Sequence, residues 1–130
     1  MKKVFTIISC FLIFLGCTTN IPTNQSENQS LSFDKNDEDE YDLIVMDLDY
    51  DYYLKAIAPP ENFYSESYYK TKNEFFVMEW NLRNSQPLNY DPNFYTSRID
   101  YNPRTNYGLH FEYKLYHFFK FIEWKYKIRL

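Results

Sequence analysis

Aromatic side chains occur every few residues between positions 41 and 130, a segment that holds all 14 tyrosines and both tryptophans of the chain. Because aromatic rings bury large areas, this segment predicts a packed core that folds without covalent cross-links. Each tyrosine hydroxyl also needs a hydrogen-bond partner, so we expect many tyrosines half-buried at the rim of the core, with the oxygen reaching water. We therefore predict one globular domain over residues 41–130.

The N-terminus has the pattern of an export signal. Lys2 and Lys3 precede an uncharged, mainly apolar run over residues 4–16. A membrane-spanning helix needs about 20 apolar residues, so this run is too short to span a bilayer. Its length is typical of the apolar core of a signal peptide, which we predict over residues 1–16. An ordinary secreted protein and an uncleaved anchor remain as alternatives.

The end of this run is similar to the lipobox of bacterial lipoproteins, in which a large apolar residue lies three positions before a cysteine and a small residue lies directly before it. Phe14 and Gly16 occupy these positions before Cys17, although leucine is commoner than Phe14. The resemblance implies that signal peptidase II cuts before Cys17 and that its thiol carries a diacylglyceryl group, which anchors the chain to membrane lipid. Because Cys10 would leave with the signal peptide, we expect no disulfide.

A polar segment rich in Thr, Asn, Ser, Gln and acidic side chains follows over residues 17–40. It has few large apolar side chains, so we predict a disordered linker. The net charge is −4, with acidic groups concentrated in residues 27–51 and basic groups in residues 104–130. Either these two regions attract each other, or the acidic region is solvated and the cations lie near a helix C-terminus, where the helix dipole favours them. We adopt the second interpretation.

The first half of the domain predicts one strand and two helices. A β-branched apolar run over residues 41–48 predicts a buried strand. Residues 49–57 predict a short helix that ends before Pro59 and Pro60. Ser65 or Ser67 can cap a longer helix that reaches residue 84. Residues 75–80 alone also fit a strand, and this alternative remains open.

The second half of the domain predicts a turn, a strand and a long C-terminal helix. Asp91 followed by Pro92 predicts a short turn near residues 93–95. Residues 96–101 fit a second strand, and residues 106–128 have two apolar rows at helical spacing. These elements predict a small α+β, helix-rich single domain.

Several common site types are absent from the sequence. After cleavage the chain would keep one glycine, Gly108, which excludes a phosphate-binding loop and a dinucleotide fingerprint. His110 and His117 are separated by about 10 Å along a helix, too far for one zinc ion, so we expect both at a helix surface or rim. The sequence therefore predicts no catalytic residue, no cofactor and no nucleic-acid partner.

Alternating acidic residues form a partial calcium-loop pattern. Asp47, Asp49 and Asp51 alternate as calcium ligands do, but Tyr52 stands where the loop needs glycine. Ala58 stands where the loop needs a bidentate glutamate. We therefore predict no metal site.

Aromatic, amide and charged side chains are mixed at the end of the helix predicted to reach residue 84. Rings can supply a platform for a glycan or a protein surface, while amide and guanidinium groups fix its orientation. The candidate binding residues are Trp80, Asn81, Arg83, Asn89, Tyr90 and Tyr95. In the alternative that we favour, these side chains lock the helix C-terminus to its following loop by hydrogen bonds.

The lipobox, the segments 73–95 and 99–108, and the aromatic C-terminal helix resemble a family of small, uncharacterised lipoproteins from Bacteroidota. The resemblance covers residues 41–130 and implies neither an activity nor catalytic residues. In such bacteria, acidic residues soon after the lipidated cysteine favour surface export. Because residues 18–22 are neutral, we expect an outer-membrane position facing the periplasm.

Three functions are compatible with these features. The leading hypothesis is a non-enzymatic envelope lipoprotein that binds a protein partner or supports an assembly. A glycan-binding module that uses exposed Tyr and Trp rings is the second, and a small hydrolase is the third. A contiguous apolar patch would favour a protein partner, a flat row of exposed rings would favour a glycan, and a deep pocket with a carboxylate would favour an enzyme.

Overall fold

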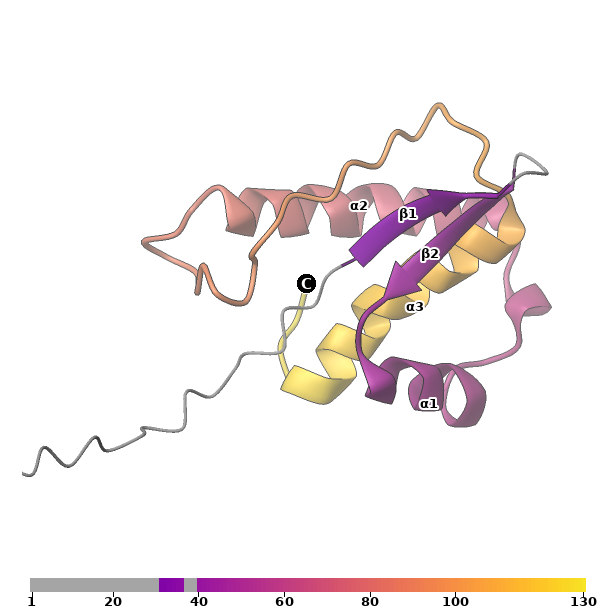
Figure 1. The fold of residues 1–130 in the computed structure, drawn as a ribbon, viewed down its shortest axis with the longest axis horizontal. Helices are drawn as coiled ribbons and strands as arrows, with labels where there is room; N and C mark the ends of the chain where they lie inside the picture. Colours follow the sequence, from indigo (N-terminus) through magenta and orange to yellow (C-terminus); the bar gives the residue numbers. More distant parts are fainter. Residues whose placement is uncertain (1–30, 37–39) are drawn as a thin grey trace, which may run out of the picture.

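The computed structural model describes residues 31–36 and 40–130, and the predicted signal peptide and Cys17 lie outside them. The elements follow in the order β1 (Leu31–Lys35), β2 (Tyr41–Val45), α1 (Leu48–Ala56), the short 3-10 helix η1 (Glu61–Phe63), α2 (Glu66–Asn84) and α3 (Leu109–Tyr126). The prediction of a small, helix-rich α+β domain with a long C-terminal helix is confirmed (Figure 1).

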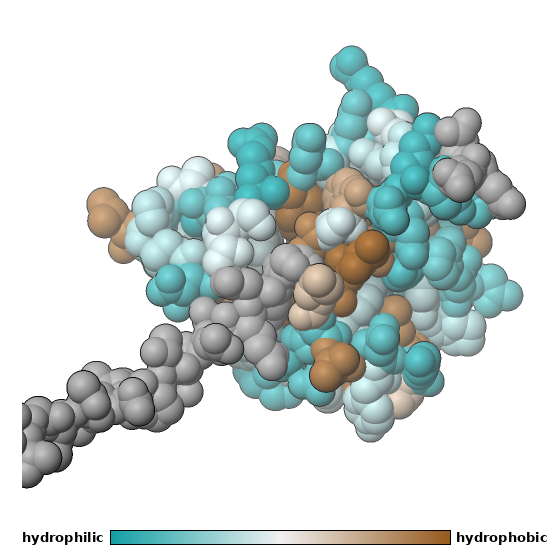
Figure 2. All heavy atoms as spheres, in the orientation of Figure 1, coloured by the Kyte–Doolittle hydropathy of each residue, from teal (hydrophilic) through white to brown (hydrophobic). Residues whose placement is uncertain are grey.

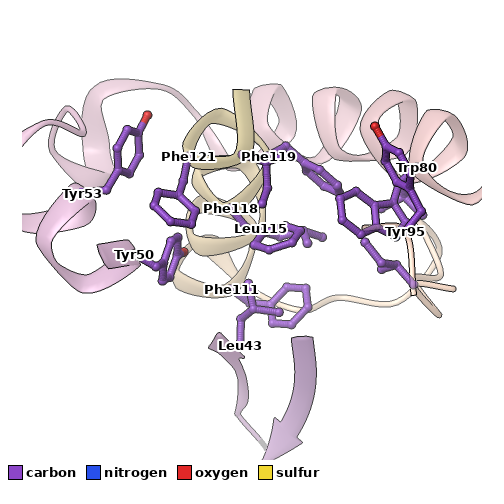
Figure 3. Close-up of a cluster of buried hydrophobic side chains, with 13 residues drawn as sticks. Leu43, Tyr50, Tyr53, Trp80, Tyr95, Phe111, Leu115, Phe118, Phe119 and Phe121 are labelled. Atoms are coloured by element: carbon purple, nitrogen blue, oxygen red, sulfur yellow. The ribbon is translucent and has the colours of Figure 1, made fainter. Parts of the chain in front are cut away.

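Helix α3 lies at the centre of the domain and contacts α2, α1, η1 and strand β2. Its fully buried side chains point in several directions around the helix, as expected for a helix that is enclosed by the rest of a domain. Figure 3 shows Tyr50 and Tyr53 of α1 on one side of α3, and Trp80 and Tyr95 on the other. The fully buried apolar side chains of α3 are Phe111, Leu115, Phe118, Phe119, Phe121 and Ile122.

Strands β1 and β2 form an antiparallel pair in which Phe33 lies opposite Leu43. Successive side chains of a strand point to opposite faces, so the alternating Leu31 and Phe33 share the face that packs on the core. The Phe33 ring contacts the edge of the Phe111 ring at a centroid distance of 5.0 Å. The prediction of disorder is therefore wrong for β1, and the domain begins before residue 41. Two apolar residues form a stable strand here only because β2 and α3 cover them.

Helices α1 and α2 begin at side-chain caps. The Asp47 carboxylate accepts a hydrogen bond from the Asp49 amide at 2.9 Å, and the Ser65 hydroxyl accepts one from the Tyr68 amide at 3.2 Å. Such caps satisfy amide groups that have no partner within the helix. The two predicted helices are thus confirmed to within one residue at their starts, and the strand alternative for residues 75–80 is wrong.

The chain between α2 and α3 makes a wide loop and returns along α2 as an extended segment (Figure 1). The predicted turn is present, and the Asp91 carboxylate accepts a hydrogen bond from the Asn93 amide at 2.9 Å. The predicted strand over residues 96–101 is absent. The backbone of Ile99 bonds the side-chain amide of Asn81 through both its N–H and its C=O, at 2.8 and 2.9 Å. The Asn81 side chain of α2 thus supplies the two backbone hydrogen bonds that a neighbouring strand would supply in a sheet.

Helix α3 begins at Leu109 after the N-cap residue Gly108, later than the predicted start at residue 106. Gly108 has φ of 86°, a conformation that is accessible to glycine and costly for other residues. The helix ends at Tyr126, two residues before the predicted end, and the left-handed φ of 55° at the C-cap residue Lys127 stops further helical hydrogen bonding. The single glycine of the described domain thus marks the point where the extended segment turns into the central helix.

The position of several tyrosines differs from the rim position that the sequence predicts. Tyr50, Tyr53, Tyr69, Tyr95 and Tyr113 are buried. The Tyr50 hydroxyl donates to the carbonyl of Lys114 at 2.6 Å, and the Tyr113 hydroxyl donates to the carbonyl of Pro59 at 3.0 Å. Backbone carbonyl groups therefore replace water as partners for Tyr50 and Tyr113, which allows these two rings to enter the core.

The central role of α3 predicts a strong stability effect at Leu115. Leu115→Ala removes fully buried methyl groups and should lower the free energy of unfolding by about 2–5 kcal/mol. The matched control is Leu88→Ala, because Leu88 is 98% exposed and its loss should change stability by less than about 0.5 kcal/mol. Urea unfolding of both variants measures the difference, and equal midpoints would contradict this account of the core.

Candidate functional site

A groove with a volume of about 600 Å³ runs along α2. One wall is α2 itself and the other is the extended segment that returns along it. The residues that line the groove are Glu74, Phe75, Val77, Met78, Asn81, Leu82, Ser85, Arg98, Tyr101 and Pro103. We call this surface the α2 groove.

Three large apolar side chains of the α2 groove are exposed. Phe75 is 61% exposed, Met78 is 62% exposed and Leu82 is 47% exposed. Residues at this three-to-four spacing lie on one face of a helix. Helix α2 therefore has two apolar faces, of which one packs on α3 and the other, the apolar stripe of Phe75, Met78 and Leu82, meets solvent. Contiguous exposed apolar surface is typical of interaction sites.

The far wall of the α2 groove is fixed by polar contacts with α2. The indole N–H of Trp80 donates to the carbonyl of Ser97 at 3.0 Å, and the ammonium group of Lys70 donates to the carbonyl of Thr105 at 3.0 Å. The Asn81 contacts with Ile99 lie between these two points. Because the segment is held at several points along its length, the groove is formed before any partner binds.

A buried carboxylate lies behind the far wall. Glu112 is fully buried and accepts hydrogen bonds from Asn73 at 2.8 Å and from the Tyr101 hydroxyl at 3.0 Å. Burial raises the pKa of Glu112, although these hydrogen bonds oppose the shift. Tyr101 lines the α2 groove and Glu112 does not, so this carboxyl group positions Tyr101. The sequence prediction missed the burial of Glu112, which could have been inferred from a charged residue within the apolar face of the C-terminal helix.

His117 is buried, and the prediction of a surface or rim position is wrong for this residue. Its ring lies among tyrosine rings, with Tyr113 at 4.5 Å and Tyr116 at 5.0 Å between centroids, and neither ring nitrogen has a hydrogen-bond partner within residues 31–36 and 40–130. Burial, with a smaller effect of Lys120, lowers the pKa of His117 to about 4. His110 lies at the surface as predicted and contacts Glu61 at 2.8 Å.

Four of the six predicted binding residues lock the end of α2 to its loop. Trp80 and Tyr95 are buried, so their faces cannot serve as platforms for a ligand. The Arg83 guanidinium donates to the Tyr95 hydroxyl at 2.9 Å and to the carbonyl of Arg129 at 2.6 Å. Asn81 holds Ile99, and it also lines the α2 groove. These contacts match the locking interpretation.

The other two predicted residues lie in the loop after α2. The Tyr90 ring is half-buried beneath the Arg83 guanidinium, at 5.2 Å from the ring centroid. Asn89 is exposed, and its side-chain amide donates to Gln86 at 3.1 Å. Neither residue lines the α2 groove. A binding role for this loop stays a prediction.

Ion pairs connect the acidic front of the domain to its basic end. Lys125 contacts the carboxylates of Asp47 at 2.8 Å and Asp49 at 3.1 Å, and Lys114 contacts Asp42 at 2.6 Å. Burial alone would lower the pKa of Lys125, but its hydrogen bonds to the two carboxylates raise it. The attraction between the two regions, which we placed second, therefore occurs at these residues, while the Asp42 and Asp49 side chains remain 52% and 65% exposed and Lys125 lies in the last turn of α3 as the adopted interpretation expects. The fold brings the two charged regions together because β2 and the start of α1 pack on α3.

Neither a metal-binding cluster nor a membrane-spanning helix is found among the described residues. Within residues 31–36 and 40–130, no cluster of three or more His, Cys, Asp or Glu side chains is placed to hold a metal ion. No helix in these ranges combines the length and the apolar composition that crossing a bilayer requires. Figure 2 shows that hydrophobic groups on the face with the two strands form separate patches within a largely hydrophilic surface.

The burial of His117 predicts a pH effect on stability. Between pH 6.5 and about 4 the unfolded chain binds a proton at this histidine and the folded chain does not, so stability falls as the pH falls. His117→Phe removes this loss, which should amount to about 3 kcal/mol. Urea unfolding at each pH gives the free energy of unfolding of the wild type and of the variant. Glu112 contributes in the opposite direction but equally in both proteins, so the difference between the two free energies cancels its contribution. His110→Phe is the control and should keep the wild-type loss; a pH-independent difference for His117→Phe would contradict the assignment.

Comparisons with curated proteins and with solved structures find no match to this chain. The sequence matches a family of unknown function, DUF6146, over residues 5–130. The match covers nearly the whole chain, including the α2 groove and the helix that supports it. The lipobox and the bacterial group that the resemblance implies stay predictions. The protein belongs to the DUF6146 family of unknown function.

Proposed function

We propose that this protein is a lipid-anchored protein of the bacterial cell envelope that binds a protein partner through the α2 groove and has no enzymatic activity. The observation that carries the proposal is the apolar stripe, Phe75, Met78 and Leu82, beside a groove with a fixed far wall. Burying such side chains against a partner contributes about 25 cal/mol for each Å² of apolar surface removed from water.

The anchor in this proposal is a diacylglyceryl group on Cys17, in the outer membrane and facing the periplasm. Its support is the sequence: Lys2 and Lys3, an apolar run too short to span a bilayer, and Gly16 directly before the cysteine. Residues 18–30 separate Cys17 from the start of β1. The α2 groove would thus face partners at or near the same membrane.

A protein partner fits this surface better than a glycan. Glycan recognition uses exposed rings together with polar groups that fix the sugar, and the Trp80 and Tyr95 rings are buried. The apolar stripe consists of one ring and two flexible aliphatic side chains, and Met in particular adapts its shape to another protein surface. The alternative of a glycan-binding module would need other rings than the predicted ones.

Substitution of Met78 tests the proposed binding surface. Met78→Glu places a charge in the middle of the apolar stripe and should weaken partner binding by about thirtyfold, as loss of an interface hot spot does. The matched control is Met46→Glu, because Met46 is 67% exposed and lies outside the α2 groove. Formaldehyde cross-linking in cells, followed by recovery of the tagged chain, should give adducts that Met78→Glu loses and Met46→Glu keeps. The proposal is wrong if both variants give the wild-type adducts.

Removal of Cys17 tests the proposed anchor. Cys17→Ala should move the protein from the membrane fraction to the soluble fraction, because the acyl chains would have no attachment point. The free energy of unfolding should not change, since residues 31–130 contain no cysteine and form no disulfide. A Cys17→Ala protein that still sediments with membranes after a high-salt wash would contradict the lipoprotein proposal.

A further inference from the structure

We propose that the partner in the α2 groove is a second copy of this chain, with the two α2 helices antiparallel about a two-fold axis near Met78. The inference rests on the proposed function of the groove as a protein-binding surface, and it names the occupant. A dimer of this kind presents the same surface twice, so each contact must occur in two symmetric copies.

The apolar stripe is self-complementary about Met78. Phe75 lies one helical turn before Met78 and Leu82 lies about one turn after it, at roughly 4.5 and 6 Å along the helix axis. A two-fold axis perpendicular to α2 at Met78 therefore places Phe75 opposite the partner's Leu82, and Met78 opposite the partner's Met78. Large and flexible apolar side chains then meet each other along the whole stripe, and no polar group is buried among them.

Two charged residues of the α2 groove are also related by this axis. Glu74 lies on α2 before Met78, on the side of the far wall where Tyr101 lies. Arg98 lies on the far wall beyond Met78, because the neighbouring Ile99 is bonded to Asn81. Among the residues that the structure describes, neither charged group has a hydrogen bond or ion pair with another side chain.

The two-fold axis brings Glu74 of each copy opposite the partner's Arg98. Both residues lie on the far-wall side of α2. Rotation about the two-fold axis leaves the far walls of the two copies on the same side and reverses the direction of the helix. A parallel arrangement has its two-fold axis along the helices, so it would put the two far walls on opposite sides and keep Glu74 away from the partner's Arg98. Exposed ion pairs add little affinity, but opposed charges select one orientation over the other. The charges therefore favour the antiparallel dimer.

The size of the surface indicates a weak dimer that membrane anchoring would support. Stable dimers bury about 1,200 Å² or more in total, whereas contact along three helical turns buries less. Two copies anchored on one bilayer have a high effective concentration, so a weak contact suffices for association. The dimer should therefore be detected in cells that produce the full, membrane-anchored chain.

Cysteine cross-linking of the full chain in cells tests the inference. Met78→Cys places a thiol on the two-fold axis, and a short bismaleimide reagent joins two thiols without an oxidant. We expect a cross-linked species at twice the monomer mass, at least tenfold more abundant than with Met46→Cys or with the wild-type chain, which controls for Cys10 and Cys17. Both substituted positions are exposed, so both variants should keep the fold.

Charge reversal tests the orientation. In the Met78→Cys background, Glu74→Arg and Arg98→Glu should each reduce the dimeric species severalfold, because like charges then face each other. Co-expression of these two variants with different tags should restore a cross-link between the tags, since each copy then supplies the charge that the other needs. Failure of this restoration would overturn the antiparallel arrangement.

The outcomes separate this inference from the proposed function. A Met78→Cys adduct with a different protein, and no dimer, would overturn the second copy as occupant and leave the groove as a protein-binding surface. No Met78-dependent adduct of any kind would overturn both. A dimer that forms equally with Met46→Cys would show non-specific proximity and would also overturn the inference.

Discussion

Helix α3 is enclosed by α1, α2 and the hairpin, and each of these elements buries its own apolar side chains against α3. In the part of the chain that the structure describes, α3 contacts α1, α2, η1 and β2, and the Phe33 ring of β1 also reaches it, so the positions of α2 and of the hairpin both depend on it. The fully buried rings of α3 provide the apolar area, and buried tyrosines such as Tyr50 and Tyr113 add hydrogen bonds to backbone carbonyls. This packing fixes the face of α2 that remains exposed to solvent.

The α2 groove depends on polar contacts as much as on apolar packing. Trp80 and Asn81 donate to the backbone of the returning segment, and Tyr101 reaches the buried Glu112. These bonds hold the segment beside α2, where it forms the far wall of the groove. The same side chains that the sequence suggested as ligand contacts therefore build the wall of the site.

The charged side chains discussed above form two sets. Lys125 with Asp47 and Asp49 connects the end of α3 to the start of α1, within the folded chain. Glu74 and Arg98 lie apart along the α2 groove, where they would face the second copy that we propose. The first set stabilises the arrangement of helices, and the second would select the orientation of a dimer.

Local pattern was sufficient for the helices, since Ser65 as a cap, the apolar rows of α3 and the Asp91 turn each depend on near neighbours in the chain. The prediction of an export signal likewise rests on the sequence alone. Strand β1, the burial of His117, the non-strand segment at Ile99 and the α2 groove were decided by tertiary structure. In each case the deciding partner lies far away in sequence, as Phe111 does for Phe33, and Glu112 for Asn73 and Tyr101. Periodicity reports that a face is apolar, but only packing determines whether the protein covers that face or leaves it for a partner.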